Sequence, residues 1–352
     1  MHPLLFFAFL LCFIGIVITA YWSIESIKAL AVKYKLSDTF VGALFLSVGT
    51  SFPEFINSIA SGFHDKGQTN PTYALYSFYN VTGANIWQVV FLSVAIAVIT
   101  INCAVKKKQQ DLDQISTIFW EDSIFSWELI FWETILLIGI FFVPPLFESF
   151  NFKGFNLINL VFLWVWIWYL KKTYQHDSKN SNRRLEFNFF NDWNKYSLLA
   201  ITLFLWIVFG SLAYANFYIT SMLPLPKSAA FGIILSFITS TPEFSALYFL
   251  FRKREYLIAV GGFFGSSLFN LTLPTYTNWI SSNSLMGKRH LNQDLSNNKI
   301  GFWLLLNLLL LVLFLFSFQK KEKWRNTIQI ANGCSMITLY ISLNILLNSL
   351  SI

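Results

Sequence analysis

Long apolar runs separated by short polar segments are the main pattern of the chain. A helix needs about 20 apolar residues to cross a hydrocarbon core of ~30 Å, and the runs have about that length. Such helices satisfy their own backbone hydrogen bonds in lipid, and the alternation typical of a β-barrel is missing. We therefore predict an all-α polytopic membrane protein. The sequence accommodates about ten transmembrane helices, near residues 3–22, 39–62, 73–101, 124–146, 155–170, 197–219, 228–250, 256–280, 300–318 and 327–350.

Composition agrees with this class. Of the 352 residues, 55% are hydrophobic and only 12% are charged, whereas soluble domains carry roughly 25% charged residues. The net charge of +7 arises from short basic clusters between the apolar runs. This distribution suits membrane topology and does not form the continuous patch of a nucleic-acid binder. Three scattered cysteines, Cys12, Cys103 and Cys334, predict neither a disulfide framework nor a zinc site.

The basic residues also predict the topology. With the N-terminus outside, the inner segments hold 19 of the 25 Lys and Arg residues, an asymmetry that places both termini outside the cytoplasm. We expect a multi-pass protein of the plasma membrane. A polar connector at 171–196 separates a five-span half at 1–170 from another at 197–352. The inner segments are 23–38, 102–123, 171–196, 251–255 and 319–326.

One unusual segment occurs twice. Residues 47–55 read SVGTSFPEF and residues 236–244 read SFITSTPEF, so six of nine positions are identical. Proline interrupts the helical hydrogen-bond ladder, and a carboxylate within hydrocarbon is costly. A single copy could be a kink in a transmembrane helix whose carboxylate extends to the membrane–water interface. Two matching copies, each in the second span of its half, indicate an internal repeat instead.

The predicted topology makes the repeats inverted, because the second span runs outward and the seventh runs inward. Secondary transporters with inverted repeats bind their substrate near the midplane, between the repeats. Each copy is followed by a glycine-rich span, YNVTGANIWQ at 79–88 and GGFFGSSLFN at 261–270. Gly83 and Gly265 would permit close approach of backbones. We expect two inverted five-helix repeats with broken helices in spans 2, 3, 7 and 8.

Each repeat places oxygen-bearing side chains on one helix face, since positions i, i+3, i+4 and i+7 share a face. Pro53 and Pro242 also remove the usual donor to the carbonyls of Gly49 and Ile238. Hydroxyl, carbonyl and carboxylate oxygens suit Ca²⁺ or Na⁺. The two stripes are Ser47, Thr50, Ser51 and Glu54, and Ser236, Thr239, Ser240 and Glu243.

The glycine-rich spans offer further oxygen atoms, although contact between helices is an alternative role for each of these residues. Two facing carboxylates can be balanced by one divalent cation or by two monovalent ones, which is a physical basis for exchange. The additional candidate ligands are Asn85, Gln88, Ser266, Ser267 and Asn270.

At these motifs the chain resembles the cation/calcium antiporter superfamily, which includes the sodium/calcium exchangers. GTSFPEF with TGANIWQ, and ITSTPEF with GSSLFN, are similar to the two α-repeats of that superfamily. The resemblance implies that Glu54 and Glu243 ligate the ion. It implies hydroxyl and backbone oxygens from Thr50, Ser51, Thr239 and Ser240, and carbonyl oxygens from Ser47 and Ser236.

The chain departs from the family pattern in the second motif of each repeat. Ala84 and Gln88 stand where the family typically has Ser and Asn, and Asn270 stands where sodium/calcium exchangers usually carry Asp. The Glu-to-Gly spacing is 29 residues in the first repeat and 22 in the second. With only Glu54 and Glu243 ionised, the site carries two negative charges. It then matches one Ca²⁺, two Na⁺ or two protons, and a third Na⁺ would remain uncompensated.

Other ionisable residues have structural interpretations. Glu128 and Glu133 in the fourth span are interpreted as interfacial or helix-pairing residues. His64, His176 and His290 are predicted to lie in solvated loops, with pH sensing as an alternative for His64.

We therefore expect a secondary active Ca²⁺ antiporter that exchanges Ca²⁺ for Na⁺ or H⁺ by alternating access, monomeric and without an organic cofactor. The alternatives are a passive cation channel, for which no filter-like motif is visible, and a Ca²⁺/H⁺ instead of a Na⁺/Ca²⁺ exchanger. A membrane enzyme is disfavoured, because no nucleophile or dinucleotide motif accompanies the glutamates.

Overall fold

The computed structural model describes most of the first half of each predicted repeat. The described residues are 3–67, 72–106, 151–152, 155–177, 190, 192–225 and 227–281, with 309, 338 and 342. The predicted fourth span lies outside this part, and so do the predicted ninth and tenth spans apart from residues 309, 338 and 342; Glu128, Glu133 and His290 also lie outside it. The helices are α1 (Pro3–Tyr34), α2 (Asp38–Phe40), η1 (Val41–Leu46), α3 (Ser47–Thr50), α4 (Phe52–Asp65), α5 (Tyr73–Lys106), α9 (Leu157–Asp177), α10 (Lys195–Ser221), α11 (Lys227–Ala229), η3 (Ala230–Leu235), α12 (Ser236–Thr239), α13 (Thr241–Arg252) and α14 (Tyr256–Ser281).

The described part is almost entirely helical and contains five helices long and apolar enough to cross a membrane. Strands β1 (Asn151–Phe152) and β2 (Phe155–Asn156) form a small antiparallel pair just before α9. This pair moves the start of the fifth span from the predicted residue 155 to Leu157, and the helix continues into the predicted connector as far as Asp177. The chain is therefore a multi-pass membrane protein, as its composition indicates.

Helix α1 is longer than the sequence predicts. The segment 23–38 was expected to be an inner loop, but α1 continues to Tyr34. Ile24, Ile27 and Ala31 recur at helical spacing and are buried, so an apolar stripe holds the extra turns against the bundle. Two charged residues of these extra turns have partners in the turn after α13: Lys28 Nζ lies 2.8 Å from Glu255 Oε1, and Glu25 Oε1 lies 3.3 Å from Lys253 Nζ.

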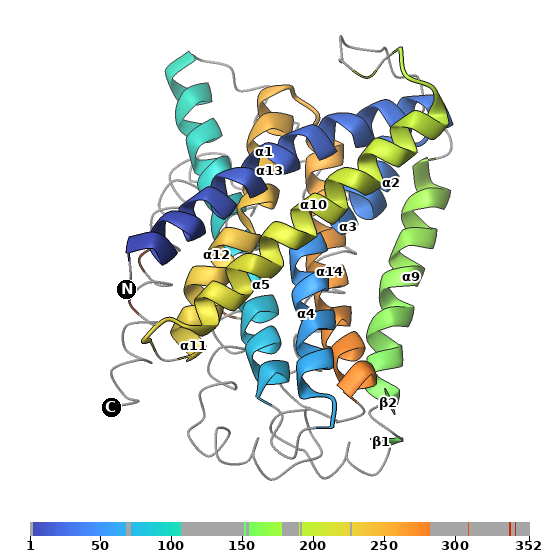
Figure 1. The fold of residues 1–352 in the computed structure, drawn as a ribbon. Coiled ribbons are helices and arrows are strands. Elements are labelled where there is room, and N and C mark those ends of the chain that lie inside the picture. Colours follow the sequence, from blue (N-terminus) through green and yellow to red (C-terminus); the bar gives the residue numbers. More distant parts are fainter. Residues whose placement is uncertain are drawn as a thin grey trace.

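Two long tilted helices cross in front of a more upright group. Helices α1 and α10 lie side by side and run in opposite directions across α4 and α13 (Figure 1). Helices α4 and α13 also run in opposite directions, as do α5 and α14 (Figure 1). Helices α1, α4 and α5 of the first half thus have the inverted counterparts α10, α13 and α14 in the second half (Figure 1). This arrangement brings the two repeated motifs to the middle of the bundle.

The repeated segments form interrupted helices. In the first half, a π-helical turn (η1) leads into α3, and α4 begins after Ser51. In the second half, η3 leads into α12, and α13 begins after Ser240. The backbone angles at the two junctions are nearly the same, φ −88° and ψ 9° at Ser51 and φ −88° and ψ −3° at Ser240. Proline in the first turn of α4 and α13 fits, because its missing N–H is not needed there.

The glycine-rich helices α5 and α14 are uninterrupted, so the prediction of broken helices in spans 3 and 8 is wrong. Their glycines serve close packing and leave the helical ladder intact. A Cβ on Gly83 would collide with the carbonyl oxygen of Gly232, and one on Gly265 would collide with that of Ala43. Each long helix therefore packs directly on the π-helical turn of the opposite repeat.

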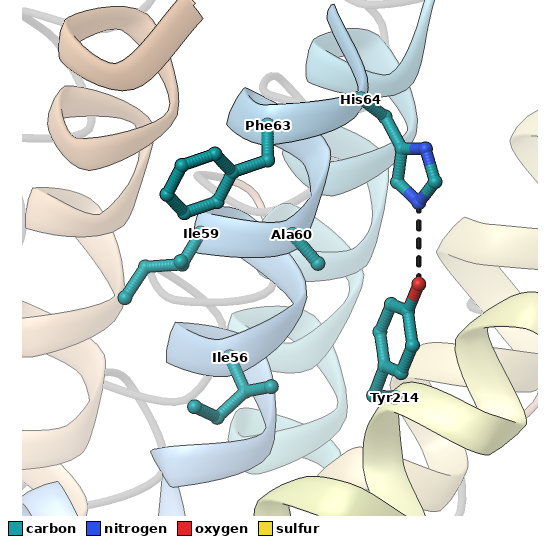
Figure 2. A pocket seen from close by; sticks show the side chains of 6 residues that line it. All are labelled: Ile56, Ile59, Ala60, Phe63, His64 and Tyr214. Carbon is teal, nitrogen blue, oxygen red and sulfur yellow. Dashed lines mark hydrogen bonds between the residues drawn. The ribbon is translucent and has the colours of Figure 1, made fainter.

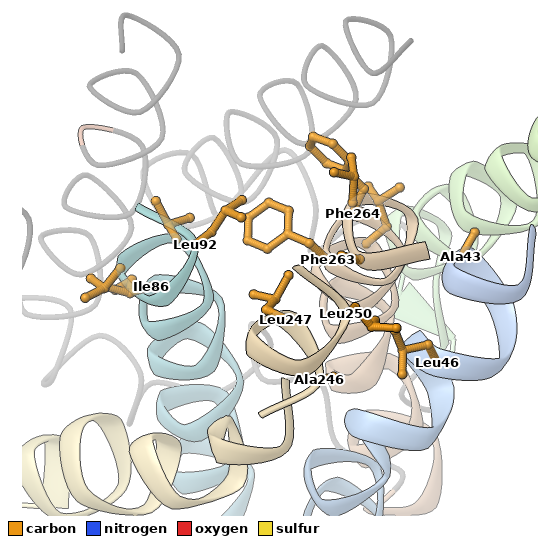
Figure 3. Close-up of a cluster of buried hydrophobic side chains, with 14 of the residues drawn as sticks. Ala43, Leu46, Ile86, Leu92, Ala246, Leu247, Leu250, Phe263 and Phe264 are labelled. Atoms are coloured by element: carbon orange, nitrogen blue, oxygen red, sulfur yellow. The ribbon is translucent and has the colours of Figure 1, made fainter. Parts of the chain in front are cut away.

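A large apolar cluster fills the space between α5, α13 and α14. Leu92 of α5 gathers there with Leu247 and Leu250 of α13 and Phe263 of α14 (Figure 3). All of these side chains are buried. The cluster surrounds the C-terminal part of α13, away from the first turn of this helix, so the end of α13 is packed among apolar side chains.

Candidate cation site

The two motif glutamates lie in the first turns of α4 and α13. Glu54 is fully buried and Glu243 is 4% exposed. Both occupy helix N-termini, where unsatisfied N–H groups and the helix dipole favour a negative charge. The interruptions at Ser51 and Ser240 create these N-termini inside the bundle, so the local chemistry of the Ser-Phe-Pro-Glu and Ser-Thr-Pro-Glu segments explains how a carboxylate can be placed there.

Glu243 has a set of neutral hydrogen-bond donors. Its Oε1 accepts from Ser51 Oγ at 3.1 Å, from Ser266 Oγ at 3.2 Å and from Gln88 Nε2 at 3.4 Å. The hydroxyls of Ser51 and Ser266 are themselves in hydrogen-bond contact, and Gln88 Nε2 donates to Ser266 Oγ at 2.8 Å. Three helices therefore converge on one carboxylate oxygen, while Oε2 has no partner among the described residues.

Glu54 is in a different situation. Neither of its carboxylate oxygens has a hydrogen-bond partner in the described part of the chain, although Glu243 and Thr239 lie within electrostatic range. By the repeat correspondence, the donors of Glu243 correspond to Ser240, Ala84 and Asn270 around Glu54. Ala84 has no hydroxyl, so one expected donor is missing. Three carboxylate oxygens of the pair thus have no hydrogen-bond partner among the described residues.

A seam of amides joins α5 to α14 beside the carboxylates. Asn270 Nδ2 donates to Asn85 Oδ1 at 3.0 Å, and Asn85 Nδ2 donates to the Ser267 carbonyl at 3.3 Å. Ser267 Oγ donates to Gln88 Oε1 at 2.8 Å. These bonds hold the two long helices together and join all five predicted residues of these helices into one network, in which Gln88 and Ser266 contact Glu243 directly.

The remaining predicted residues are buried; Ser47, Thr50 and Ser236 bond to carbonyls of the preceding helical turn, whereas Thr239 and Ser240 bond to α5. Ser47 Oγ donates to the Leu44 carbonyl at 3.1 Å, and Thr50 Oγ1 donates to the Leu46 carbonyl at 2.9 Å. In the second repeat, Thr239 Oγ1 donates to Asn80 Oδ1 at 3.3 Å and Ser240 Oγ donates to the Ala84 carbonyl at 3.4 Å. Ser236 Oγ donates to the Gly232 carbonyl. A hydroxyl that donates in this way keeps its lone pairs for a cation.

Three buried polar residues near the site were not predicted. Asn57 and Ser61 lie on α4 at three and seven positions after Glu54, and Asn80 lies on α5. All three are fully buried. The same helical spacing that identified the first stripe, continued past Glu54, would have found the two residues on α4.

His64 is helical, so the prediction that it lies in a loop is wrong; His176 too lies within a helix, α9. His64 is in the last turn of α4, where it hydrogen-bonds Tyr214 of α10 across 3.3 Å and stacks on Tyr73 at a ring-centroid distance of 4.7 Å. It borders an apolar groove of about 540 Å³ between α4 and α10 (Figure 2). The apolar lining does not offer cation ligands; the groove is lined by Ile56, Ile59, Ala60, Phe63, His64 and Tyr214.

The donor set suits a hard cation. No group of three or more His, Cys, Asp or Glu side chains occurs among the described residues, so the site consists of two carboxylates within neutral hydroxyl and amide oxygens. Ca²⁺ and Na⁺ prefer such oxygens, whereas zinc and copper prefer nitrogen and sulfur.

Two buried carboxylates lie between inverted, interrupted helices of a membrane protein, and this arrangement makes them the candidate cation site. A family model described as "Sodium/calcium exchanger protein" matches residues 4–171 and 195–347. The chain belongs to this family, and the two matched segments correspond to its two halves. No curated protein sequence matches the chain significantly.

Solved structures with a similar fold include several of the sodium-calcium exchanger NCX_Mj. The form soaked with 2.5 mM Na⁺ and 0.1 mM Ca²⁺ aligns with a TM-score of 0.57 and 17% identity, over 96% of this chain and 99% of the other. The form soaked with 100 mM Na⁺ and 10 mM Sr²⁺ gives a TM-score of 0.58 and 18% identity, with the same coverage. At this identity the likeness establishes the fold.

Proposed function

We propose that the chain is a secondary active antiporter that exchanges Ca²⁺ for Na⁺ or H⁺ across the plasma membrane, with the cation held between Glu54 and Glu243. Family membership supports antiport, and the similar structures belong to an exchanger described with Na⁺, Ca²⁺ and Sr²⁺. The observation that carries the proposal is the carboxylate pair, buried at the junction of the two repeats with three oxygens that have no partner among the described residues.

The charge of the site limits what it can hold. No basic side chain among the described residues interacts with either glutamate, so a bound cation would supply the compensating charge. One Ca²⁺ balances both carboxylates, and so do two Na⁺ or two protons; a third Na⁺ would remain an unpaired charge in a low dielectric. Exchange follows from this equivalence. An empty site would carry two uncompensated negative charges in a low dielectric, so the protein switches its access between the two sides of the membrane only when the site is loaded.

Alternating access would arise from movement of the helix pair α1 and α10 against the core that carries the site. These two helices cross the interrupted helices and contribute none of the predicted ligands (Figure 1).

We place the two repeats at 1–170 and 197–352 with a cytoplasmic connector at 171–196, both termini outside, and we expect a monomer to be sufficient.

The test is ⁴⁵Ca²⁺ uptake into proteoliposomes under imposed outward gradients of Na⁺, K⁺ or H⁺. Uptake driven by one gradient and absent without it supports antiport and identifies the counter-ion. Uptake that needs no counter-ion indicates a channel and contradicts the proposal.

Glu54→Gln and Glu243→Gln are each expected to lower uptake by at least about 100-fold, because one lost charge leaves Ca²⁺ half neutralised. Glu255→Gln is the matched control, since Glu255 lies outside the site in the turn after α13. Near-normal uptake by both site variants would remove the glutamate pair from the mechanism.

A further inference from the structure

The surface of α4 that carries Glu54 remains polar all the way to the end of the helix. Asn57, Ser61 and Asp65 follow Glu54 at intervals of three or four residues and are buried, so they lie on one helix face. Ser58 belongs to the same side, where its hydroxyl meets that of Ser77 of α5 at 2.8 Å. From Glu54 to Ser61 the helix rises about 10 Å.

Several polar atoms on this face of α4 and on the adjoining helix α5 have no hydrogen-bond partner in the described chain. On α4 these are both amide atoms of Asn57 and the hydroxyl of Ser61, and on α5 the Nδ2 of Asn80. Asn80 Oδ1 meets Thr239, so the series connects to the glutamate site. Asp65 ends it, because its carboxylate accepts the N–H groups of Thr72, Tyr73 and Ala74 and thereby caps α5. Burying unpaired polar groups is unfavourable, which calls for a role that uses them.

The second repeat has no equivalent of this face. The positions corresponding to Asn57, Ser58 and Ser61 are Ala246, Leu247 and Leu250. They are buried in the apolar cluster around α13 (Figure 3). The polar series is thus confined to one of two otherwise matching helices, and helix packing alone does not require it.

We infer that Asn57, Ser61 and Asn80 form a transit site for a partly dehydrated cation between Glu54 and the end of α4. Amide and hydroxyl oxygens replace part of the hydration shell of the ion. Because the site is neutral, it binds weakly enough to release the ion in either direction, as conduction through several successive sites requires. The inference rests on the proposed cation exchange and adds a route that serves one face of the membrane.

The test gives α4 the residues of α13 in the variant Asn57→Ala/Ser61→Leu. Ca²⁺ transport is measured in right-side-out and inverted vesicles, and ⁴⁵Ca²⁺ binding at equilibrium is measured on purified protein. We expect the maximal rate to fall by about tenfold, and KM for Ca²⁺ to rise only at the face where α4 ends, with the binding constant at equilibrium unchanged. Phe63→Leu, on an exposed position of the same helix, is the control.

Unchanged rate and KM in the double variant overturn the transit site, and so does a loss of equilibrium binding in a folded protein, which would assign these residues to the glutamate site. Absence of exchange by the unmodified protein refutes the proposed function instead. If the double variant does not fold, Asn57→Asp decides: a carboxylate of similar size should lower KM at the face where α4 ends and slow release. An Asn57→Asp variant with unaltered KM and rate overturns the inference.

Discussion

The two interrupted helices agree closely where they hold the glutamates and differ beyond them. Glu54 and Glu243 both follow a junction with nearly the same backbone angles. Past that turn, α4 presents buried polar residues, whereas α13 presents Ala246, Leu247 and Leu250 to an apolar cluster. The two repeats therefore share the backbone geometry around the glutamates, whereas the helix ends beyond them differ in polarity.

The carboxylates themselves repeat this contrast. Glu243 accepts three hydrogen bonds, and Glu54 accepts none from the described residues. The cause can be traced to single positions, since Ser266 contacts Glu243 and its counterpart Ala84 has no hydroxyl. If the pair holds a cation as proposed, the charge of Glu54 depends more on that cation for compensation than the charge of Glu243 does.

The largest effect is expected where the repeats contact each other most closely. In Gly83→Ala and Gly265→Ala the new Cβ would overlap a backbone carbonyl oxygen of the other repeat. Backbone cannot move aside as a flexible side chain can, so we expect a loss of at least about 3 kcal/mol of stability or no folded protein. Thermal unfolding of the purified variants measures this loss.

Gly67→Ala is the control for these variants. Gly67 has open space around it but a φ of +78°, so alanine there should cost only about 1 kcal/mol. If the three variants were equally stable, the two glycines would not be packing contacts between the repeats.

A second loss of stability is expected in the apolar cluster around the end of α13. Leu250→Ser removes a buried side chain from the apolar cluster and introduces a hydroxyl, and we expect it to cost about 2–5 kcal/mol. Tyr248→Ser, on the exposed surface of the same helix, should cost less than about 1 kcal/mol. Chemical denaturation of both variants provides the comparison. Equal stability would mean that the end of α13 is as polar an environment as the end of α4.

A smaller effect tests the unequal carboxylates. Ser266→Ala removes a donor from Glu243 and should destabilise the cation-free protein by about 1–3 kcal/mol, whereas Ala84→Ser supplies Glu54 with a donor and should stabilise it by about 1 kcal/mol. Thermal unfolding in the presence of a chelator measures both, with the exposed Ser211→Ala as control. Shifts of the same sign in the two site variants would contradict the assigned correspondence between positions 84 and 266.

The smallest effect on stability is expected at the end of α13. The turn after α13 is joined to α1 by the ion pairs Lys28–Glu255 and Lys253–Glu25, at 2.8 and 3.3 Å. Burial lowers the pKa of Lys253, but Glu25 and Glu255 outweigh it, so this pKa lies above its usual value. Lys28→Met should cost about 1 kcal/mol or less, and the loss should shrink at high salt. Unfolding at two ionic strengths tests this, and a loss independent of salt would exclude a mainly ionic contact.

Much of the site could be predicted from the sequence because the repeat of a costly Pro-Glu pair has few structural explanations. Glycine-rich segments were less informative, since Gly83 and Gly265 suit both a broken helix and a close contact between intact ones. Which of the two structures forms depends on how the opposite repeat packs against the glycine, and the local sequence pattern carries no information about that packing. The hydrogen-bond partners of Glu243 likewise depend on how α5 and α14 meet. In contrast, helical spacing alone could have predicted that Asn57 and Ser61 share a helix face with Glu54.

Equilibrium binding of ⁴⁵Ca²⁺ to the purified protein tests the central claim most directly. The glutamate pair predicts one Ca²⁺ per chain in the unmodified protein and in Glu255→Gln. Affinity should fall by at least about 100-fold in both Glu54→Gln and Glu243→Gln, since each leaves the ion with one carboxylate. Retention of the unmodified affinity by either variant would contradict the account.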